Sequence, residues 1–134
     1  RPAFRVNGTN VSYQTLSNVN LKGSAITTIY NQGNYFNANT GIFTAPVAGL
    51  YQVCLIGRTY SNAYAGISSM AVKKLSGAVT TVAAYIEWYN NTSVNHIGGS
   101  SVVKLAVGDT LGLYVNSGTI TFDNNDSYSV TFLG

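Results

Sequence analysis

Apolar residues recur with a period of two along almost the whole chain, and no window carries the 3.6-residue apolar stripe of an amphipathic helix with capping signals. A period of two places successive side chains on opposite faces of a strand. Turn signals rich in Gly, Asn and Asp separate the segments at short, fairly even intervals, as in β-sandwiches and barrels. The sequence therefore predicts an all-β fold, with strands at residues 3–6, 11–16, 25–30, 41–44, 50–60, 67–75, 79–89, 94–107, 110–115, 119–122 and 128–133.

The segment 81–89 shows the alternation most clearly. One face of this segment is rich in aromatic rings and has Glu87 as its only charge, which suits either a subunit interface or a sugar-stacking surface. The face that we expect to enter the core is apolar throughout: Val82, Ala84, Ile86 and Trp88.

The segment 50–60 is apolar on both faces. Such strands are normally covered on both sides, so we expect this one to be buried on both. It contains Cys54, the only cysteine, whose apolar neighbours predict a buried thiol and whose isolation rules out a disulfide within the chain.

Charged residues make up only 8% of the chain, against about 25% in typical soluble domains. A surface poor in long charged side chains loses little conformational entropy and little hydration when it docks, which favours homo-oligomerisation. The seven basic residues include one adjacent pair, Lys73 and Lys74, and form no stripe that would bind a nucleic-acid backbone.

The length of 134 residues suits a single globular domain with one core. The sequence opens at Arg1 without a signal peptide, and it has no apolar run long enough to insert into a membrane. We therefore expect residues 1–134 to be one head domain, cut from the carboxyl end of a longer chain.

Catalytic residues are not predicted. His96 is the only histidine, and neither it nor Cys54 stands in a recognisable nucleophile motif. The four carboxylates form no obvious acid/base pair. We expect a protein that is not an enzyme and needs no cofactor.

One loop offers a candidate metal site. Asp123 and Asp126 flank two asparagines, and their oxygens are donors of the kind that Ca²⁺ prefers. The spacing matches no defined calcium loop, so the alternative is a turn closed by its own Asp and Asn side chains.

Three clusters of aromatic and amide side chains are candidates for contacts with a sugar or a protein receptor. Rings stack on apolar sugar faces while amides and hydroxyls supply directed hydrogen bonds. The alternative is that these rings cap the core or a subunit seam. The candidate residues are Tyr60, Asn62 and Tyr64, then Trp88, Tyr89 and Asn91, and finally Asn124 and Tyr128.

Residues 30–55 read YNQGNYFNANTGIFTAPVAGLYQVCL, and this block resembles the signature of the C1q domain. The start of the chain, RPAFRV, is similar to the first strand of that family, and the pattern around Leu105 is similar to its Leu-x-x-Gly-Asp turn. The last strand departs from the closing segment of animal members. The matching signature positions are Asn31, Thr40, Gly41, Phe43, Pro46, Gly49, Tyr51, Gly108 and Asp109.

The resemblance implies a ten-stranded jelly-roll β-sandwich of the C1q/TNF-like type, assembled with two identical subunits into a compact homotrimer. Some such trimers carry calcium at the apex. In this reading Gly41 and Gly49 allow tight strand entries, Pro46 sets the connecting turn, and Phe43 and Tyr51 anchor the two sheets.

The low charge and the abundance of Asn and Thr resemble family members on bacteriophage tail fibres and bacterial surface or spore filaments. This resemblance implies a recognition head on a virion tail fibre or cell surface that binds a glycan or protein receptor. Two alternatives are a secreted, complement-like lectin head and a structural cap that drives trimerisation and binds no receptor.

Overall fold

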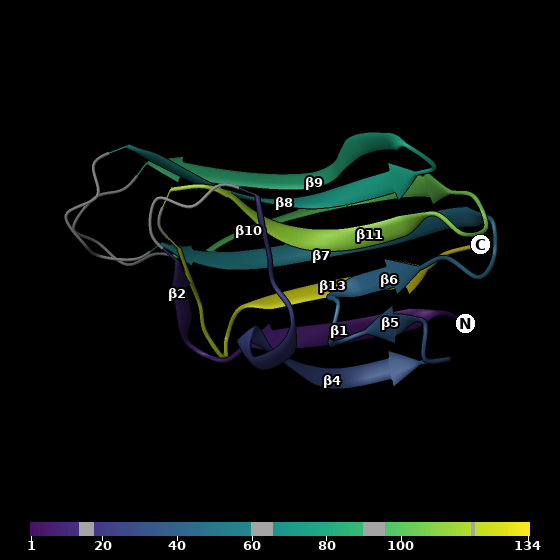
Figure 1. Cartoon of the computed structure of the whole chain (residues 1–134), viewed down its shortest axis with the longest axis horizontal. Helices are drawn as coiled ribbons and strands as arrows, with labels where there is room; N and C mark the ends of the chain where they lie inside the picture. Colours follow the sequence, from purple (N-terminus) through teal and green to yellow (C-terminus); the bar gives the residue numbers. More distant parts are fainter. Residues whose placement is uncertain (14–17, 60–65, 90–95, 119) are drawn as a thin grey trace.

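The computed structural model describes residues 1–13, 18–59, 66–89, 96–118 and 120–134. These residues form two antiparallel sheets whose long strands run along the long axis of the molecule, and both termini lie at the same end (Figure 1). None of the described residues belongs to a helix long and apolar enough to cross a membrane.

The first sheet has seven strands, in which β4, β1, β13, β7 and β10 lie side by side, with β12 also paired to β7 and β2 paired to β12. Its strands are β1 (Ala3–Gly8), β2 (Val11–Tyr13), β4 (Ile26–Gln32), β7 (Gly49–Thr59), β10 (His96–Leu105), β12 (Ile120–Phe122) and β13 (Ser127–Phe132).

The second sheet has six strands in the order β5, β6, β11, β8 and β9, with β3 also paired to β11. A 3-10 turn, η1 (Gly23–Ala25), precedes β4. The strands are β3 (Val19–Asn20), β5 (Phe36–Asn37), β6 (Ile42–Thr44), β8 (Ile67–Ser76), β9 (Val79–Tyr89) and β11 (Thr110–Ser117). Two antiparallel sheets with these non-sequential neighbours form the predicted jelly-roll sandwich.

Aromatic rings from both sheets meet in the core between them. Phe4 of β1 stacks on Phe36 of β5 at 4.1 Å between ring centroids and meets the edge of Tyr128 at 5.0 Å. Phe43 of β6 packs against Tyr51 of β7 at 5.7 Å, so these two rings join the sheets as expected. Burial of such large rings is a principal source of stability in a sandwich.

Other signature residues shape the segment between β4 and β7. Gly41 has a φ of +67°, and a Cβ there would overlap the carbonyl oxygen of Leu21, so this position requires glycine. The Asn31 side chain donates to the Phe36 carbonyl and accepts from the Phe36 N–H. The Tyr51 hydroxyl donates to the carbonyl of Val47 at 2.7 Å, in the link that contains Pro46.

Each of the eleven predicted strands overlaps an observed one, and the boundaries of β9 agree. The predicted ends at residues 14–16, 60, 94–95 and 119 lie outside the described residues. The prediction missed β3 and β5, because two-residue strands are too short to show a period.

The predicted core face of β9 needs one correction. Ala84, Ile86 and Trp88 are buried, but Val82 is 58% exposed and Ala83 is buried in its place. The pairing with β8 slips here, since Val72 faces Ala84 while Lys73 faces Val82. This β-bulge leaves Ala83 unpaired and reverses the alternation before it.

Strand β7 is also not covered on both faces within the described chain. Tyr51, Val53 and Leu55 enter the core, whereas Leu50 and Ile56 are 45% and 39% exposed. Cys54 lies on the exposed side and is half-buried, so the prediction of a buried thiol is wrong for the single chain. The second sheet covers one face of β7 and leaves the other open.

Candidate functional site

The loop between β12 and β13 is closed by its own carboxylates. The Asp126 N–H donates to the Asp123 carbonyl at 3.1 Å, and the Asp123 N–H donates to Asp126 Oδ2 at 2.8 Å. Asp123 Oδ1 accepts the N–H groups of Asn125 at 2.8 Å and of Asp126 at 3.2 Å. The loop is therefore a turn built on Asp side chains, which is the alternative that its sequence left open.

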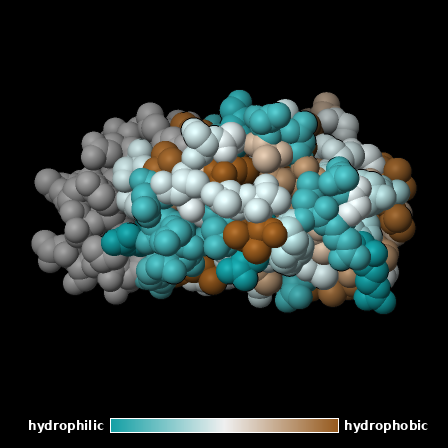
Figure 2. Space-filling model, turned by 90° about the horizontal axis from the view of Figure 1, so that it is seen from below, coloured by the Kyte–Doolittle hydropathy of each residue, from teal (hydrophilic) through white to brown (hydrophobic). Residues whose placement is uncertain are grey.

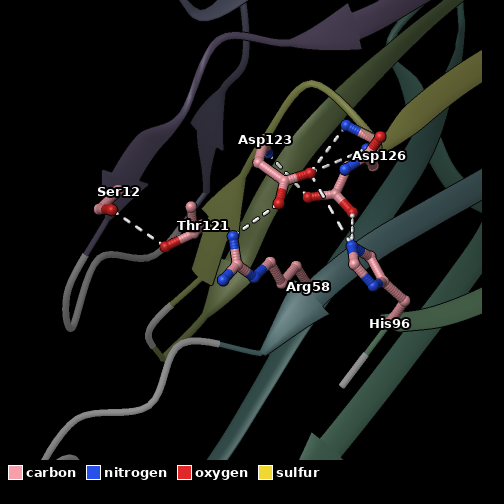
Figure 3. A network of polar contacts seen from close by, with 7 residues as sticks. Ser12, Arg58, His96, Thr121, Asp123 and Asp126 are labelled. Carbon is pink, nitrogen blue, oxygen red and sulfur yellow. Dashed lines mark hydrogen bonds and ion pairs between the residues drawn. The ribbon is translucent and has the colours of Figure 1, made fainter. Parts of the chain in front are cut away.

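Two cationic or potentially cationic side chains from the first sheet meet this loop (Figure 3). His96 begins β10 and lies opposite Arg58 of β7 in the antiparallel register. Arg58 Nη1 donates to Asp123 Oδ2 at 2.6 Å. His96 Nε2 lies 3.2 Å from Asp126 Oδ1 and 3.8 Å from Asp123 Oδ1. We call His96, Asp123, Asp126 and Arg58 the acidic cluster.

The two carboxyls of the cluster have different environments. Asp126 is fully buried, and burial raises the pKa of its carboxyl to about 6. Burial also acts against ionisation of Asp123, but the Asn125 N–H and the Arg58 guanidinium outweigh it and lower the pKa of that carboxyl. Asp123 is thus held ionised, whereas Asp126 is a carboxyl whose charge is poorly compensated.

The arrangement can hold a divalent cation. One imidazole nitrogen and one oxygen from each carboxylate lie within 4.8 Å of one another. The sequence singled out Asp123 and Asp126 for an all-oxygen calcium loop, and the structure adds a nitrogen donor to that pair. The sequence did not connect His96 with this loop, and it drew no attention to Arg58. Their meeting with the loop depends on sheet register, so no local signal in the sequence could have revealed it.

A second acidic turn links β10 to β11. The Asp109 N–H donates to the Ala106 carbonyl at 3.1 Å, and the Ala106 N–H donates to Asp109 Oδ2 at 2.9 Å. Lys74 Nζ lies 3.7 Å from Asp109 Oδ2. The backbone hydrogen bond from Ala106 is the main cause that lowers the pKa of Asp109, with Ser76 and Lys74 contributing. Gly108 precedes it with a φ of +87°, so this turn is structural as expected.

The predicted receptor contacts divide by burial. Tyr89 is 69% exposed, and Asn124 is also exposed. Trp88 and Tyr128 are only 5% and 1% exposed, which corrects their choice as surface contacts. Both rings face the core because they occupy inward positions of β9 and β13. The remaining candidates, Tyr60, Asn62, Tyr64 and Asn91, lie outside the described residues.

Comparisons with known proteins show one family and a shared fold. The C1q domain family matches residues 3–134. Among solved structures, the globular domain of zebrafish complement 1qA protein superposes with a TM-score of 0.71 at 16% identity, over 100% of this chain and 98% of that one. Murine APRIL at pH 8.5 gives 0.73 at 10% identity, over 98% of both chains. Eiger TNF from S. frugiperda gives 0.71 at 12% identity, over 100% of this chain and 94% of that one.

The identity to these solved structures is low, so their likeness bears on the fold alone, and it agrees with the two-sheet sandwich described above. The match of the C1q domain over residues 3–134 spans both sheets and every signature position. The chain therefore belongs to the C1q domain family.

Proposed function

We propose that the chain is one subunit of a homotrimeric recognition head at the end of a fibre, where it binds a cell-surface glycan or protein receptor. C1q and TNF-like domains are non-enzymatic ligand- or receptor-binding modules, typically extracellular or secreted, so the prediction that the chain is not an enzyme is confirmed at the level of the family. The trimer, the fibre and the receptor are the parts that we propose.

The observation that carries the trimer is the outward face of the first sheet. Three adjacent strands, β13, β7 and β10, present alternate side chains away from the core, and the register aligns these side chains in rows. One row joins Ser129, Cys54 and Ser100, and the next joins Ser127, Ile56 and Gly98. The residues of this face, which we call the interface face, are Leu50, Gln52, Cys54, Ile56, Gly98, Ser100, Val102, Lys104, Ser127, Ser129 and Thr131.

The interface face is suited to close contact with another copy of the chain. Its one charged side chain is Lys104, which lies opposite Leu50 at the edge of the face, and its other residues are small or apolar except for Gln52. Three of the apolar ones, Leu50, Ile56 and Val102, are 45%, 39% and 56% exposed in the single chain. A partner that covered them would gain hydrophobic stabilisation, and the long side chain of Lys104 at the edge of the face lets its ammonium stay in water. On the side of the molecule seen in Figure 2, by contrast, apolar residues form separate patches among polar ones.

The position of the termini supports binding at the opposite end of the head. Both termini lie at one end of the sandwich, and the acidic cluster lies towards the other (Figure 1, Figure 3). A stalk joined to Arg1 would leave that other end facing outwards. Tyr89, at the end of β9, and Asn124 are exposed there and are the described residues that we propose as receptor contacts.

Two valines of equal exposure provide a matched test of the trimer. Val102 on β10 is 56% exposed within the interface face, and Val82 on β9 is 58% exposed on the second sheet. We expect the wild-type chain and Val82→Glu to have a trimer mass by light scattering, and Val102→Glu to be a monomer because it would bury three unpaired carboxylates. A wild-type monomer at micromolar concentration, or a trimer in both variants, would contradict the proposal.

Receptor binding is tested by adsorption of the fluorescently labelled head to a panel of bacterial cells and to arrayed glycans. We expect Tyr89→Ser to weaken adsorption by about fivefold, since stacking on a ring contributes about 1 kcal/mol. Tyr35→Ser is the control, because Tyr35 is 39% exposed and follows the β4 end that pairs with Ala3, near the termini. A trimer that adsorbs to nothing would instead favour the structural cap.

A further inference from the structure

We propose that His96, Asp126 and Asp123 form a binding site for a first-row transition-metal ion of the Zn²⁺ type, with one site in each chain. This inference does not rest on the proposed fibre function, because all three donors come from a single subunit. It also differs from the calcium loop that the sequence suggested, since it depends on a histidine from β10.

The first observation is an unsatisfied buried oxygen. Asp126 is 0% exposed, and its Oδ1 accepts no hydrogen bond from the described residues. It points towards His96 Nε2, which lies 3.2 Å away, so the imidazole nitrogen is the group that it faces (Figure 3). A buried carboxylate oxygen without a hydrogen-bond donor is costly, and a cation between it and the imidazole would remove that cost.

The second observation is that both carboxylates are held in place by their other contacts. Asp126 Oδ2 is fixed by the Asp123 N–H, which leaves Oδ1 directed at His96. Asp123 Oδ2 is fixed by Arg58, and Asp123 Oδ1 faces the same imidazole while accepting two backbone N–H groups. Metal-binding carboxylates are commonly oriented by such outer hydrogen bonds. Asp123 is the weaker ligand of the two because its facing oxygen is already engaged.

The donor separations suit an ion shared by the three groups. Zn²⁺ lies about 2.0–2.2 Å from nitrogen and carboxylate oxygen, so two donors to one tetrahedral ion stand about 3.4 Å apart. The observed separations from His96 Nε2 are 3.2 Å to Asp126 Oδ1 and 3.8 Å to Asp123 Oδ1. The His96 side chain is 45% exposed, so water has access to the remaining coordination positions.

The chemistry of the donors selects the class of ion. Imidazole suits Zn²⁺, Ni²⁺ and Co²⁺, whereas Ca²⁺ requires six to eight oxygens and seldom takes nitrogen. Two carboxylates and one guanidinium leave the cluster with a net negative charge when His96 is neutral. A divalent cation therefore complements the site, even though Arg58 already compensates Asp123.

The competing explanation is that His96 donates an Nε2–H hydrogen bond to Asp126 Oδ1 and that no metal binds. The two explanations differ in their response to Zn²⁺. The experiment uses the full chain without a histidine tag, in a Cys54→Ser background so that the thiol cannot bind the ion. After treatment with a chelator and dialysis, the protein is titrated with Zn²⁺ and with Ca²⁺ by calorimetry, and Co²⁺ is added to follow its visible absorption.

We expect one Zn²⁺ per chain, a Co²⁺ absorption band that Zn²⁺ abolishes, and weaker binding of Ca²⁺. His96→Asn and Asp126→Asn should each lower the Zn²⁺ affinity by about 100-fold or more, because loss of an outer partner alone costs about 10–100-fold. Glu87→Gln removes an exposed carboxylate on β9 and should leave the affinity unchanged.

Three results would overturn the proposal. The first is the absence of both Zn²⁺ heat and a Co²⁺ band, which would leave His96 as an ion-pair partner only. The second is Zn²⁺ binding that persists in His96→Asn. The third is Ca²⁺ binding tighter than Zn²⁺ binding, which would indicate the all-oxygen calcium site that the sequence suggested. His96 is at the surface, so its variant tests the site even if Asp126→Asn does not fold.

Discussion

The two acidic turns at opposite ends of β10 share one local geometry and differ in everything around it. In each turn an Asp side chain accepts the N–H of the residue three positions earlier, at 2.9 Å for Asp109 and 2.8 Å for Asp126. In each, the Asp N–H returns to the carbonyl of that same residue at 3.1 Å. Yet the pKa of Asp109 is lowered and the pKa of Asp126 is raised to about 6.

The neighbours of each turn explain the difference. Asp109 is nearly buried, but the Ala106 N–H, Ser76 and Lys74 all favour its charge. Asp126 is fully buried beside a second carboxylate, and the Arg58 guanidinium pairs with Asp123. The same turn therefore contains a well-compensated carboxylate at one end of β10 and a poorly compensated one at the other. Local hydrogen bonds form the turn, and the tertiary environment decides whether a carboxylate oxygen has no hydrogen-bond donor.

The glycine near each turn provides the largest expected contrast. A Cβ on Gly8 would overlap the carbonyl oxygens of Phe122 and Asp123, whereas a Cβ on Gly108 would meet open space. We expect Gly8→Ala to lower the free energy of unfolding by about 3 kcal/mol, because backbone must move. Gly108→Ala should lower it by about 1 kcal/mol, from its φ of +87° alone. Urea denaturation measures both, and equal losses would show that the turn at Asp126 is as loosely packed as the other.

Removing the cation from each turn should give a smaller contrast. Arg58→Met leaves Asp123 Oδ2 almost buried without its partner, and we expect it to lower the free energy of unfolding by about 2 kcal/mol. Lys74→Met removes a longer contact of 3.7 Å from Asp109, which keeps its backbone hydrogen bond, and an exposed hydrogen bond of 2.9 Å to the Lys104 carbonyl, and should cost about 1 kcal/mol. The measurement is urea denaturation at neutral pH with a chelator present. A larger loss in Lys74→Met would reverse our ranking of the two turns.

The free energy of unfolding should depend on pH with opposite signs at the two turns, as measured against an Asp→Asn variant of each. This is the smallest of the three expected effects at any one pH, because asparagine keeps an acceptor oxygen. The lowered pKa of Asp109 means that its stabilisation, relative to Asp109→Asn, is present above the ordinary value of 3.8 and is lost as pH falls through the folded value. The raised pKa of Asp126 means that its stability, relative to Asp126→Asn, is greatest below 3.8 and is lost as pH rises through about 6.

Denaturation of the wild type and both variants from acid to neutral pH, with a chelator present, measures these slopes. Slopes of the same sign would show that the two carboxyls have the same environment.

Much of the fold could be predicted from the sequence. The period of two and the turn residues located eleven strands, and the block at residues 30–55 indicated the family that the match over residues 3–134 then showed. These features are local, since strand alternation and turn chemistry depend on neighbouring residues. The misplaced face at Val82 arose because a one-residue bulge is decided by pairing with β8, which no pattern within β9 records.

The candidate site could be predicted only in part. Asp123 and Asp126 were recognisable, because they lie three residues apart in one loop. The alternation of residues 81–89 correctly placed Trp88 on the core face, but its choice and that of Tyr128 as receptor contacts were wrong, because a ring next to an asparagine-rich turn can lie on either face of its strand. Whether the half-buried Cys54 and its neighbours are covered by two identical subunits remains a prediction for the trimer test.

By itself, the sequence determined the all-β class, the turns and the aromatic residues that join the sheets, because side-chain alternation and glycine or proline chemistry act over a few residues. Only the tertiary structure decided that His96 and Arg58 meet Asp123 and Asp126. Antiparallel pairing of β7 with β10 brings together residues that are far apart in the chain. Burial then leaves one oxygen of Asp126 without a hydrogen bond, and that depends on the whole sandwich.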